Sequence, residues 1–199
     1  MKKGPSMNSP APSSHVVILC HPAPDSFNAA VATRYCETVR QCGQQAVLRD
    51  LYAMHFDPVL RAEEQPGSAD FVVHPDVLAE RALIADAKVV VLVYPIWLGS
   101  PPAMLKGYVE RVFCTGLAGK DLLSFSSSGN SQVWLEEQGE WQSLLHLFDR
   151  YIRHAFAMGS TEHVHFRSVV KGMNERFFSQ NMEDVRQAAT RACRESAAP

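Results

Sequence analysis

The stretch KVVVLVYPIW, Lys88–Trp97, is the strongest strand signal in the chain. It is an almost unbroken run of β-branched and large apolar residues, which predicts a strand buried on both faces of a sheet. Apolar residues recur at helical spacing on either side of it, in Pro75–Ala87 and Pro101–Phe113. A buried strand between two amphipathic helices is typical of a parallel sheet that helices cover on both faces.

The same alternation continues to both ends of the chain. The segment Ala53–His74 is polar and contains prolines, so we expect it to be irregular. Five strand–helix units joined by right-handed crossovers predict an α/β three-layer sandwich with a flavodoxin-like, five-stranded parallel sheet in the order 2-1-3-4-5. The remaining predicted elements are strands at His15–Cys20, Gln45–Tyr52, Asp121–Gly129 and Ser160–Val170, helices at Ser26–Cys42 and Asn174–Cys193, and one helix or two, broken at Gly139, at Ser131–Met158.

Length and composition limit the function classes. The chain has 199 residues, of which 46% are hydrophobic, enough for one domain, which we place at residues 15–199. The formal net charge of −2 gives no basic field for nucleic acid, and no apolar run is long enough for membrane insertion. The five cysteines form no CxxC pair, and the start of the chain lacks a secretory pattern, which together favour the cytoplasm. Residues 1–14 are rich in Pro and Ser and predict a disordered tail.

Ligands of such sheets bind outside the carboxyl ends of the strands, so the loops after strands one, three and four carry the candidate site. The first loop is HPAPDSFN, His21–Asn28, which enters a helix without any glycine. The amide groups and the positive dipole end of that helix suit an anion, and His21, Ser26 and Asn28 add side-chain donors. Asp25, Ser26 and Asn28 are equally ordinary at a helix start, so the residues alone leave anion binding and capping about even.

The other two loops offer an aromatic wall and a set of small donors. Trp97 follows Pro95 and precedes Pro101 and Pro102, which makes a stiff turn against which a planar ligand could lie. Trp97 could equally be the rim of the core. The third loop, residues 126–130 (SSSGN), suits the polar edge of a heterocycle or forms an ordinary turn.

Competing motifs are absent or incomplete. No GxGxxG follows the first strand, no GxSxG elbow exists, and GLAGKD (Gly116–Asp121) has too few residues between its glycines for a P-loop. His163 and His165 share one face of the predicted fifth strand. With no third ligand in view, an ordinary polar pair is favoured over a metal site, and we expect no metal.

Three segments together resemble the flavodoxin-like NAD(P)H:quinone oxidoreductases of the DT-diaphorase type. They are the HPxxxSFN loop, the DLY after the second strand, and YPIWLGSPPAMLKGYVERVF at Tyr94–Phe113. The resemblance covers the chain from His15 to Asn130, and beyond that only the order of strands and helices. It implies a homodimeric flavoprotein that passes a hydride from NAD(P)H to the flavin and then two electrons to a quinone or similar acceptor.

The resemblance also assigns the site residue by residue, with backbone amides near N5 and O4 of the flavin. The flavin phosphate would be held by His21, Ser26, Phe27 and Asn28. The isoalloxazine ring would lie against Pro95, Ile96, Trp97, Leu98 and Gly99. The pyrimidine edge of that ring would contact Ser126, Ser127, Ser128 and Gly129.

Three departures from the family pattern concern the chemistry. Where the family has a tyrosine and a histidine that assist hydride transfer, the matching positions are Trp134 and Glu140. Glu140 can act as an acid or base, whereas Trp134 cannot donate a phenolic proton. Glu140 is therefore one catalytic candidate, and Trp97, beside the expected ring, is the other. The connection Cys114–Lys120 is short, and the long C-terminal extension of the larger members is missing. With fewer walls to fix an adenosine, FMN is expected, with FAD as the alternative.

These features predict an NAD(P)H-dependent flavin oxidoreductase that uses a quinone, azo or nitro compound as acceptor. Two other functions fit the same fold. A flavodoxin-type FMN electron carrier is one, although carriers usually dock through strongly charged surfaces. A regulatory subunit that binds a partner without significant turnover is the other.

Overall fold

The computed structural model describes residues 14–130, 136–137 and 139–197. At its centre is a sheet of five parallel strands in the order β2-β1-β3-β4-β5, which confirms the predicted order. The strands are β1 (Ser14–Leu19), β2 (Gln45–Asp50), β3 (Val89–Pro95), β4 (Asp121–Ser127) and β5 (Thr161–Phe166).

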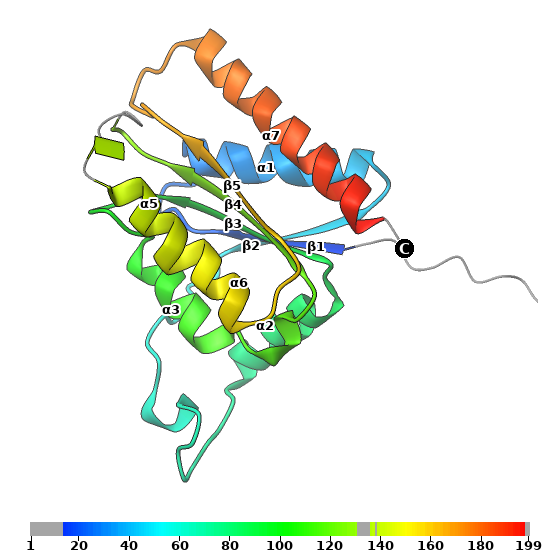
Figure 1. The fold of residues 1–199 in the computed structure, drawn as a ribbon, viewed down its shortest axis with the longest axis vertical. Coiled ribbons are helices and arrows are strands. Elements are labelled where there is room, and N and C mark those ends of the chain that lie inside the picture. Colours follow the sequence, from blue (N-terminus) through cyan, green and yellow to red (C-terminus); the bar gives the residue numbers. More distant parts are fainter. Residues whose placement is uncertain (1–13, 131–135, 138, 198–199) are drawn as a thin grey trace, which may run out of the picture.

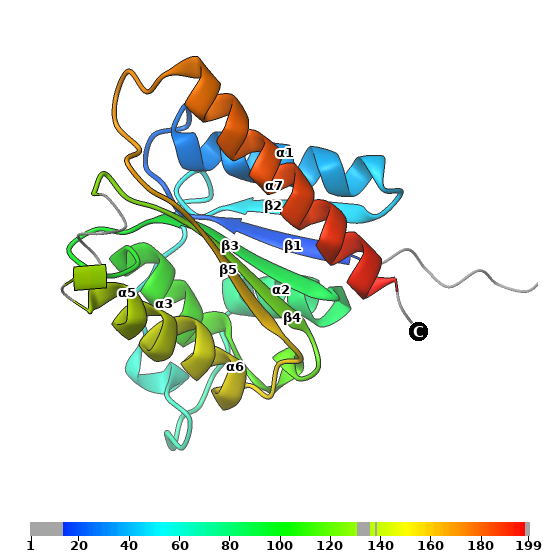
Figure 2. The same ribbon diagram turned by 45° about the horizontal axis from the view of Figure 1, so that its top comes forward.

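Helices cover both faces of the sheet and give three layers (Figures 1 and 2). The helices α1 and α7 lie together on one face, and α2, α3, α5 and α6 lie on the other. Within the described part of the chain, no helix combines the length and the apolar character needed to cross a bilayer. The helical segments are α1 (Phe27–Gln41), η1 (Ala62–Glu64), α2 (Pro75–Asp86), α3 (Ala103–Val112), η2 (Thr115–Leu117), α5 (Glu140–Leu144), the π-helical turn η3 (Leu145–Arg150), α6 (Tyr151–Ala155) and α7 (Glu175–Ser196).

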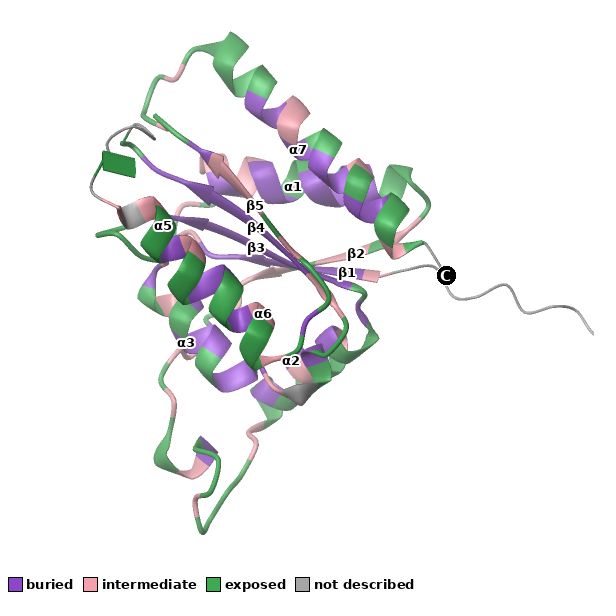
Figure 3. Cartoon of the chain, viewed as in Figure 1, coloured by how far each residue is buried: buried purple, intermediate pink, exposed green. Residues whose placement is uncertain are grey.

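The Val-rich run that predicts the central strand is buried at every position of β3 (Figure 3). Its side chains alternate between two apolar cores, because successive residues of a strand point to opposite faces. Val91 and Val93 pack on the side of α1 and α7, whereas Val90 and Leu92 pack on the side of α2 and α3. Each such side chain contributes about 1.5–3 kcal/mol by leaving water, so this strand anchors both outer layers.

All five predicted strands run further at the carboxyl end than the observed ones, most clearly β3 and β5, and one strand begins earlier than predicted. β3 ends at Pro95 rather than at Trp97, and β5 ends at Phe166 rather than at Val170. Ser168 has a φ of 54°, a left-handed conformation that no strand residue adopts, so the chain turns out of the sheet there. β1 begins at Ser14, the last residue of the predicted tail.

The predicted helical segment at residues 131–158 contains the expected break. Gly139 has a φ of 71°, and a helix begins at the next residue and continues through α5, η3 and α6. Residues 131–135 and 138 of that prediction lie outside the described residues. The π-helical turn η3 carries Asp149, which is only 2% exposed and lies against the sheet. Such turns occur preferentially at functional positions.

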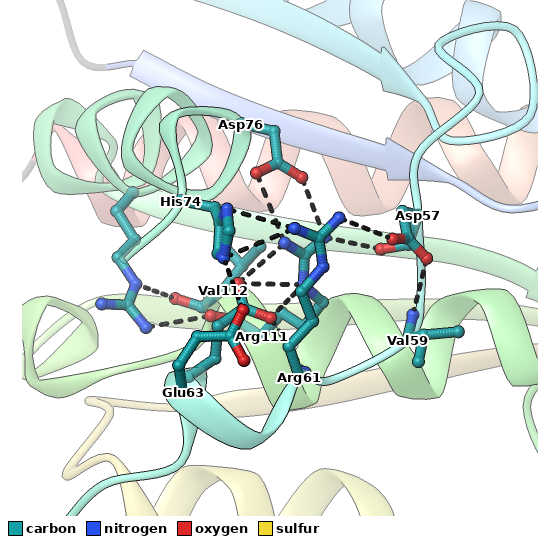
Figure 4. A network of polar contacts seen from close by, with 10 residues as sticks. Asp57, Val59, Arg61, Glu63, His74, Asp76, Arg111 and Val112 are labelled. Atoms are coloured by element: carbon teal, nitrogen blue, oxygen red, sulfur yellow. Dashed lines mark hydrogen bonds and ion pairs between the residues drawn. The ribbon is translucent and has the colours of Figure 1, made fainter. Parts of the chain in front are cut away.

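The segment between β2 and α2, residues 51–74, is irregular apart from η1, as the sequence predicts. We call it the excursion; it projects from the body of the molecule at the bottom of Figure 1. The buried guanidinium of Arg111, in α3, holds the excursion against the body of the molecule (Figure 4). The Arg111 guanidinium pairs with Glu64 at 2.7 Å and with Asp76 at 2.8 Å, and donates to the carbonyl of Asp57 at 2.6 Å. The Arg111 guanidinium also holds the pKa of the Glu64 carboxyl below its usual range.

Candidate functional site

A cavity of about 560 Å³ opens at the carboxyl ends of β1, β3, β4 and β5. This is where open α/β sheets bind ligands, and the volume is that of a small-molecule site. Four loops line it: His21, Ala23, Asp25, Ser26, Phe27 and Asn28; Pro95, Ile96 and Trp97; Ser127, Ser128 and Gly129; Val169, Val170, Lys171 and Met173.

Most of the residues predicted for the site therefore line one cavity. Leu98, Gly99 and Ser126 do not. Trp134 lies outside the described residues, as does the side chain of Glu140, the first residue of α5.

The N-terminus of α1 presents an anion-binding end to the cavity. Ser26 caps the helix, because its Oγ accepts a hydrogen bond from the backbone N–H of Ala29 at 3.1 Å. The first turn contains no acidic residue, so the positive end of the helix dipole is not neutralised within the helix. Lys171 adds a cation to the cavity lining and Asp25 adds a carboxylate. The balance at this end favours a phosphate or another anion.

Two side chains of the first loop are fixed by contacts within the protein. Asn28 is 3% exposed, and its Oδ1 accepts a hydrogen bond from Ser127 Oγ at 2.9 Å, so its NH₂ group remains a donor. The Phe27 ring packs edge-on against Phe166 and Phe178, with ring centroids 5.3 and 6.1 Å away. These contacts join the ends of β1, β4 and β5 into one wall.

His21 and Trp97 stand side by side at the cavity. Their ring centroids are 5.8 Å apart and the rings are tilted by 58°. His21 Nδ1 accepts a hydrogen bond from the backbone N–H of Ala23 at 3.0 Å, which leaves Nε2 as the protonated nitrogen of the neutral ring. His21 therefore offers a donor, and Trp97, 43% exposed, offers a flat surface.

Residues Trp97–Ser100 form a tight turn, which determines which backbone N–H groups remain free to bind a ligand. The N–H of Trp97 donates to Ser100 O at 3.0 Å, and the N–H of Ser100 donates back at 3.2 Å. The two residues between them are in the left-handed region, with φ of 51° at Leu98 and 77° at Gly99. Within the described part of the chain, only the amides of Leu98 and Gly99 in this turn lack a hydrogen bond. A leucine in this conformation is strained, and such strain concentrates at functional sites.

The three consecutive serines divide between the two faces of the sheet. Ser127 points toward α1 and bonds Asn28, whereas Ser126 and Ser128 point toward α5 and bond histidines of β5. Ser126 is fully buried under the sheet and Ser128 lies at the cavity edge.

The sequence reasoning missed the contribution of the loop after β5. Val169, Val170, Lys171 and Met173 line the cavity, and Val170 is 58% exposed. The rule that selects carboxyl-end loops applies to this strand as well and could have found them. The prediction instead placed Val169 and Val170 inside a longer fifth strand.

A family model described as the flavodoxin-like fold matches residues 13–194. The chain belongs to the flavodoxin-like fold family. This membership confirms the predicted resemblance to flavodoxin-like NAD(P)H:quinone oxidoreductases at the level of the family.

Several relatives of this flavodoxin-like chain carry the names of redox proteins. An uncharacterized NAD(P)H oxidoreductase of Haemophilus influenzae is 37% identical over 108 residues, 54% of this chain and 54% of that protein. The chain thus spans about half the length of the curated relatives it matches.

Two solved structures share the fold. An NAD(P)H:quinone oxidoreductase from Methanothermobacter marburgensis has a TM-score of 0.77 and 23% identity, covering 90% of this chain and 96% of that one. An FMN-dependent NADH-azoreductase from Bacillus anthracis, in complex with FMN, has a TM-score of 0.66 and 14% identity, covering 91% and 99%. At these identities the likeness shows the fold.

Proposed function

We propose that this flavodoxin-like protein is an NAD(P)H-dependent flavin oxidoreductase that passes two electrons to a quinone-like acceptor. One observation carries the proposal: four loops at the carboxyl ends of the strands line a single cavity that has an anion-binding helix end on one side and an exposed aromatic turn on another. The names of the relatives and structural neighbours point to the same reaction class.

The residues of the cavity fit FMN. Ser26, the first-turn amides of α1 and Lys171 suit the phosphate, and Trp97 suits the flat ring system. Ser127, Ser128 and Gly129 suit the pyrimidine edge with donors and a close backbone approach. We favour FMN over FAD because the anion end of the cavity has the right chemistry for one phosphate.

When bound, a flavin supplies the two-electron chemistry, accepting a hydride from NAD(P)H and passing it to the acceptor. The chain supplies position and electrostatics. The amides of Leu98 and Gly99 follow the cavity-lining Trp97 and make no hydrogen bond within the described residues, so they would be free to donate to a ring bound against Trp97, which is the logic of an oxyanion hole. The exposed side chains of Trp97 and Val170 line the cavity and would shield a bound ring from water.

Trp97 and Glu140 remain the predicted catalytic residues, and the acceptor remains a quinone, azo or nitro compound. The homodimer remains a prediction of the resemblance, and the cytoplasmic location remains a prediction from the cysteines and the start of the chain.

Turnover by the purified, FMN-loaded protein tests the proposal. We expect oxidation of NADH or NADPH that depends on an added benzoquinone, azo dye or nitro compound, at a rate far above that of free FMN at the same concentration. A flavin-loaded protein that oxidises NAD(P)H with none of these acceptors contradicts the enzyme and favours an electron carrier.

A further inference from the structure

A continuous chain of hydrogen bonds runs from η3 to the cavity, along the face of the sheet that α5 and α6 cover (Figure 1). It links Asp149, His163, Ser126, His165 and Ser128, and we call it the polar chain. Asp149 Oδ2 lies 2.7 Å from His163 Nδ1, and His163 Nε2 lies 2.6 Å from Ser126 Oγ. Ser126 Oγ lies 2.8 Å from His165 Nδ1, and His165 Nε2 lies 3.0 Å from Ser128 Oγ. The inner end is closed to water, whereas the outer end lines the cavity.

The elements around the polar chain hold it in place. Ser124 Oγ donates to the other carboxylate oxygen of Asp149 at 2.5 Å. The Trp141 ring of α5 lies over both imidazoles, with centroids 5.0 Å from each. Because every polar atom of the chain has a partner and Trp141 covers the two imidazoles, the chain is better protected from exchange with water than hydrogen bonds at the surface are.

Each bond between His163 and Ser128 can run in either direction, because a serine hydroxyl and an imidazole both donate and accept. In one polarity every hydrogen bond points from Ser128 toward Asp149. In the other, His163 carries protons on both nitrogens, Nδ1 still donates to Asp149, the remaining bonds point toward Ser128, and the Ser128 hydroxyl donates to the carbonyl of Asn130 at 3.1 Å. The two polarities differ by one proton and use the same heavy-atom contacts.

We propose that the polar chain is a proton relay that supplies the cavity with the proton that accompanies each hydride. This inference rests on the proposed function. His163 and Asp149 store the proton, Ser126 and His165 pass it on, and Ser128 delivers it. The relay residues come from β4 and the residue after it, from β5 and from η3.

The proton balance shows why such a relay is needed. NAD(P)H gives up a hydride, which is one proton with two electrons, and a quinone needs two electrons and two protons to become a hydroquinone. The O–H bond of Ser128 would break and its proton would pass into the cavity, where the quinone takes up one hydride and one proton to become the hydroquinone. His165 Nε2 then passes its proton to Ser128, Ser126 passes its proton to His165 Nδ1, and His163 Nε2 passes its proton to Ser126. This leaves His163 neutral. A proton from solvent reloads the chain through the open cavity, and no electron passes through it.

The charges around the histidines suit these roles. His163 faces Asp149 from η3, Tyr94 from β3 and His165 along β5. Burial, followed by the neighbouring charges of His163 and Arg167, lowers the pKa of His165 to about 4. His165 therefore stays neutral near pH 7 and passes a proton by accepting on one nitrogen and releasing from the other.

Ser126→Ala cuts the relay in the middle, and Thr161→Val is its matched control. Both delete a buried hydroxyl of the sheet, but Ser126 lies between the cavity and His163, whereas the Thr161 hydroxyl makes no hydrogen bond within the described residues. We expect Ser126→Ala to slow quinone reduction about 100-fold, with FMN affinity unchanged, and Thr161→Val to slow it about twofold or less. Ser126→Thr, which restores a hydroxyl, should recover most of the rate. Equal rates for Ser126→Ala and Thr161→Val, in a wild type that turns over, overturn the relay and leave the proposed function standing.

A second measurement needs neither cofactor nor turnover. Nitrogen-15 NMR of the histidine side chains, recorded between about pH 5 and 9, reports the tautomer and charge of each ring. We expect the His165 proton to move from Nδ1 to Nε2 whenever the second nitrogen of His163 is protonated, and this coupling to vanish in Ser126→Ala. A His165 that keeps one tautomer throughout, or becomes charged together with His163, overturns the relay.

Discussion

The hydroxyl of Ser26 serves a helix and a cavity at the same time. It caps α1 by accepting from the N–H of Ala29, and it lines the cavity at the end where the helix dipole is positive. Capping alone would explain a serine at this position, as it does at many helix starts. A change that preserves the cap but alters the charge separates the two roles.

Ser26→Asp is that change. Aspartate caps a helix as well as serine does, so we expect an unchanged melting temperature. Its carboxylate would face the FMN phosphate, so we expect FMN affinity to fall about tenfold or more, which is about 1.4 kcal/mol. Fluorescence titration with FMN measures the loss, and riboflavin, which has no phosphate, is the control. An equal loss for both flavins would show that this loop does not bind the phosphate.

For single residues, the sequence predicted which loops form the cavity better than it predicted the directions of their side chains. His21, Ser26, Phe27 and Asn28 could be predicted to share a cavity because a strand and a helix fix their place. The separate directions of Ser126 and Ser127 follow from strand alternation, but which of them faces the cavity depends on where β4 ends. Ser168 turns the chain at the end of β5, and a single serine between Arg167 and Val169 is too weak a turn signal to end a strand in a prediction.

Among the elements, α3 organises both the site and the excursion. Its first residues follow the Trp97–Ser100 turn, and Arg111 near its end binds the excursion through Glu64 and Asp57. Gly107 lies one helical turn before Arg111 on the same face, where the backbone of Pro58 passes so closely that a Cβ would lie 2.1 Å from the Pro58 carbonyl oxygen. Glycine is therefore required here for close packing.

Gly107→Ala tests that packing. Alanine in a helix normally adds about 1 kcal/mol of stability over glycine. Here we expect the reverse, a loss of about 1–3 kcal/mol in the free energy of unfolding, because the excursion must move away from α3. Gly116→Ala is the control, since a Cβ there would meet nothing closer than Cys114 Sγ at 3.9 Å. Denaturant unfolding of the three proteins decides, and a Gly107→Ala protein more stable than the wild type would contradict this account.

The elements themselves could be predicted because their causes are local. Apolar runs specify β1 and β3, and Gly139 breaks the helix where expected. The π-helical turn could not be predicted, because it depends on Asp149 meeting Ser124 and His163 from other parts of the chain. The anchoring of the excursion by Arg111 could not be predicted either, because its partners Glu64 and Asp76 also come from other parts of the chain.

At the scale of the whole molecule, the order of the strands places the site. β1 and β3 are neighbours while their helices leave toward opposite faces of the sheet, so their carboxyl-end loops diverge and open a crevice. The first loop, the Trp97 turn and the serines after β4 all border that crevice. The central claim is that this crevice holds FMN in a form that NAD(P)H reduces.

The absorption spectrum of the protein, recorded anaerobically after addition of FMN and removal of the excess, tests that claim most directly. The account predicts a bound flavin spectrum that one equivalent of NADH or NADPH bleaches and that a quinone restores. A protein that retains no flavin, or a bound flavin that neither nucleotide bleaches, would contradict it.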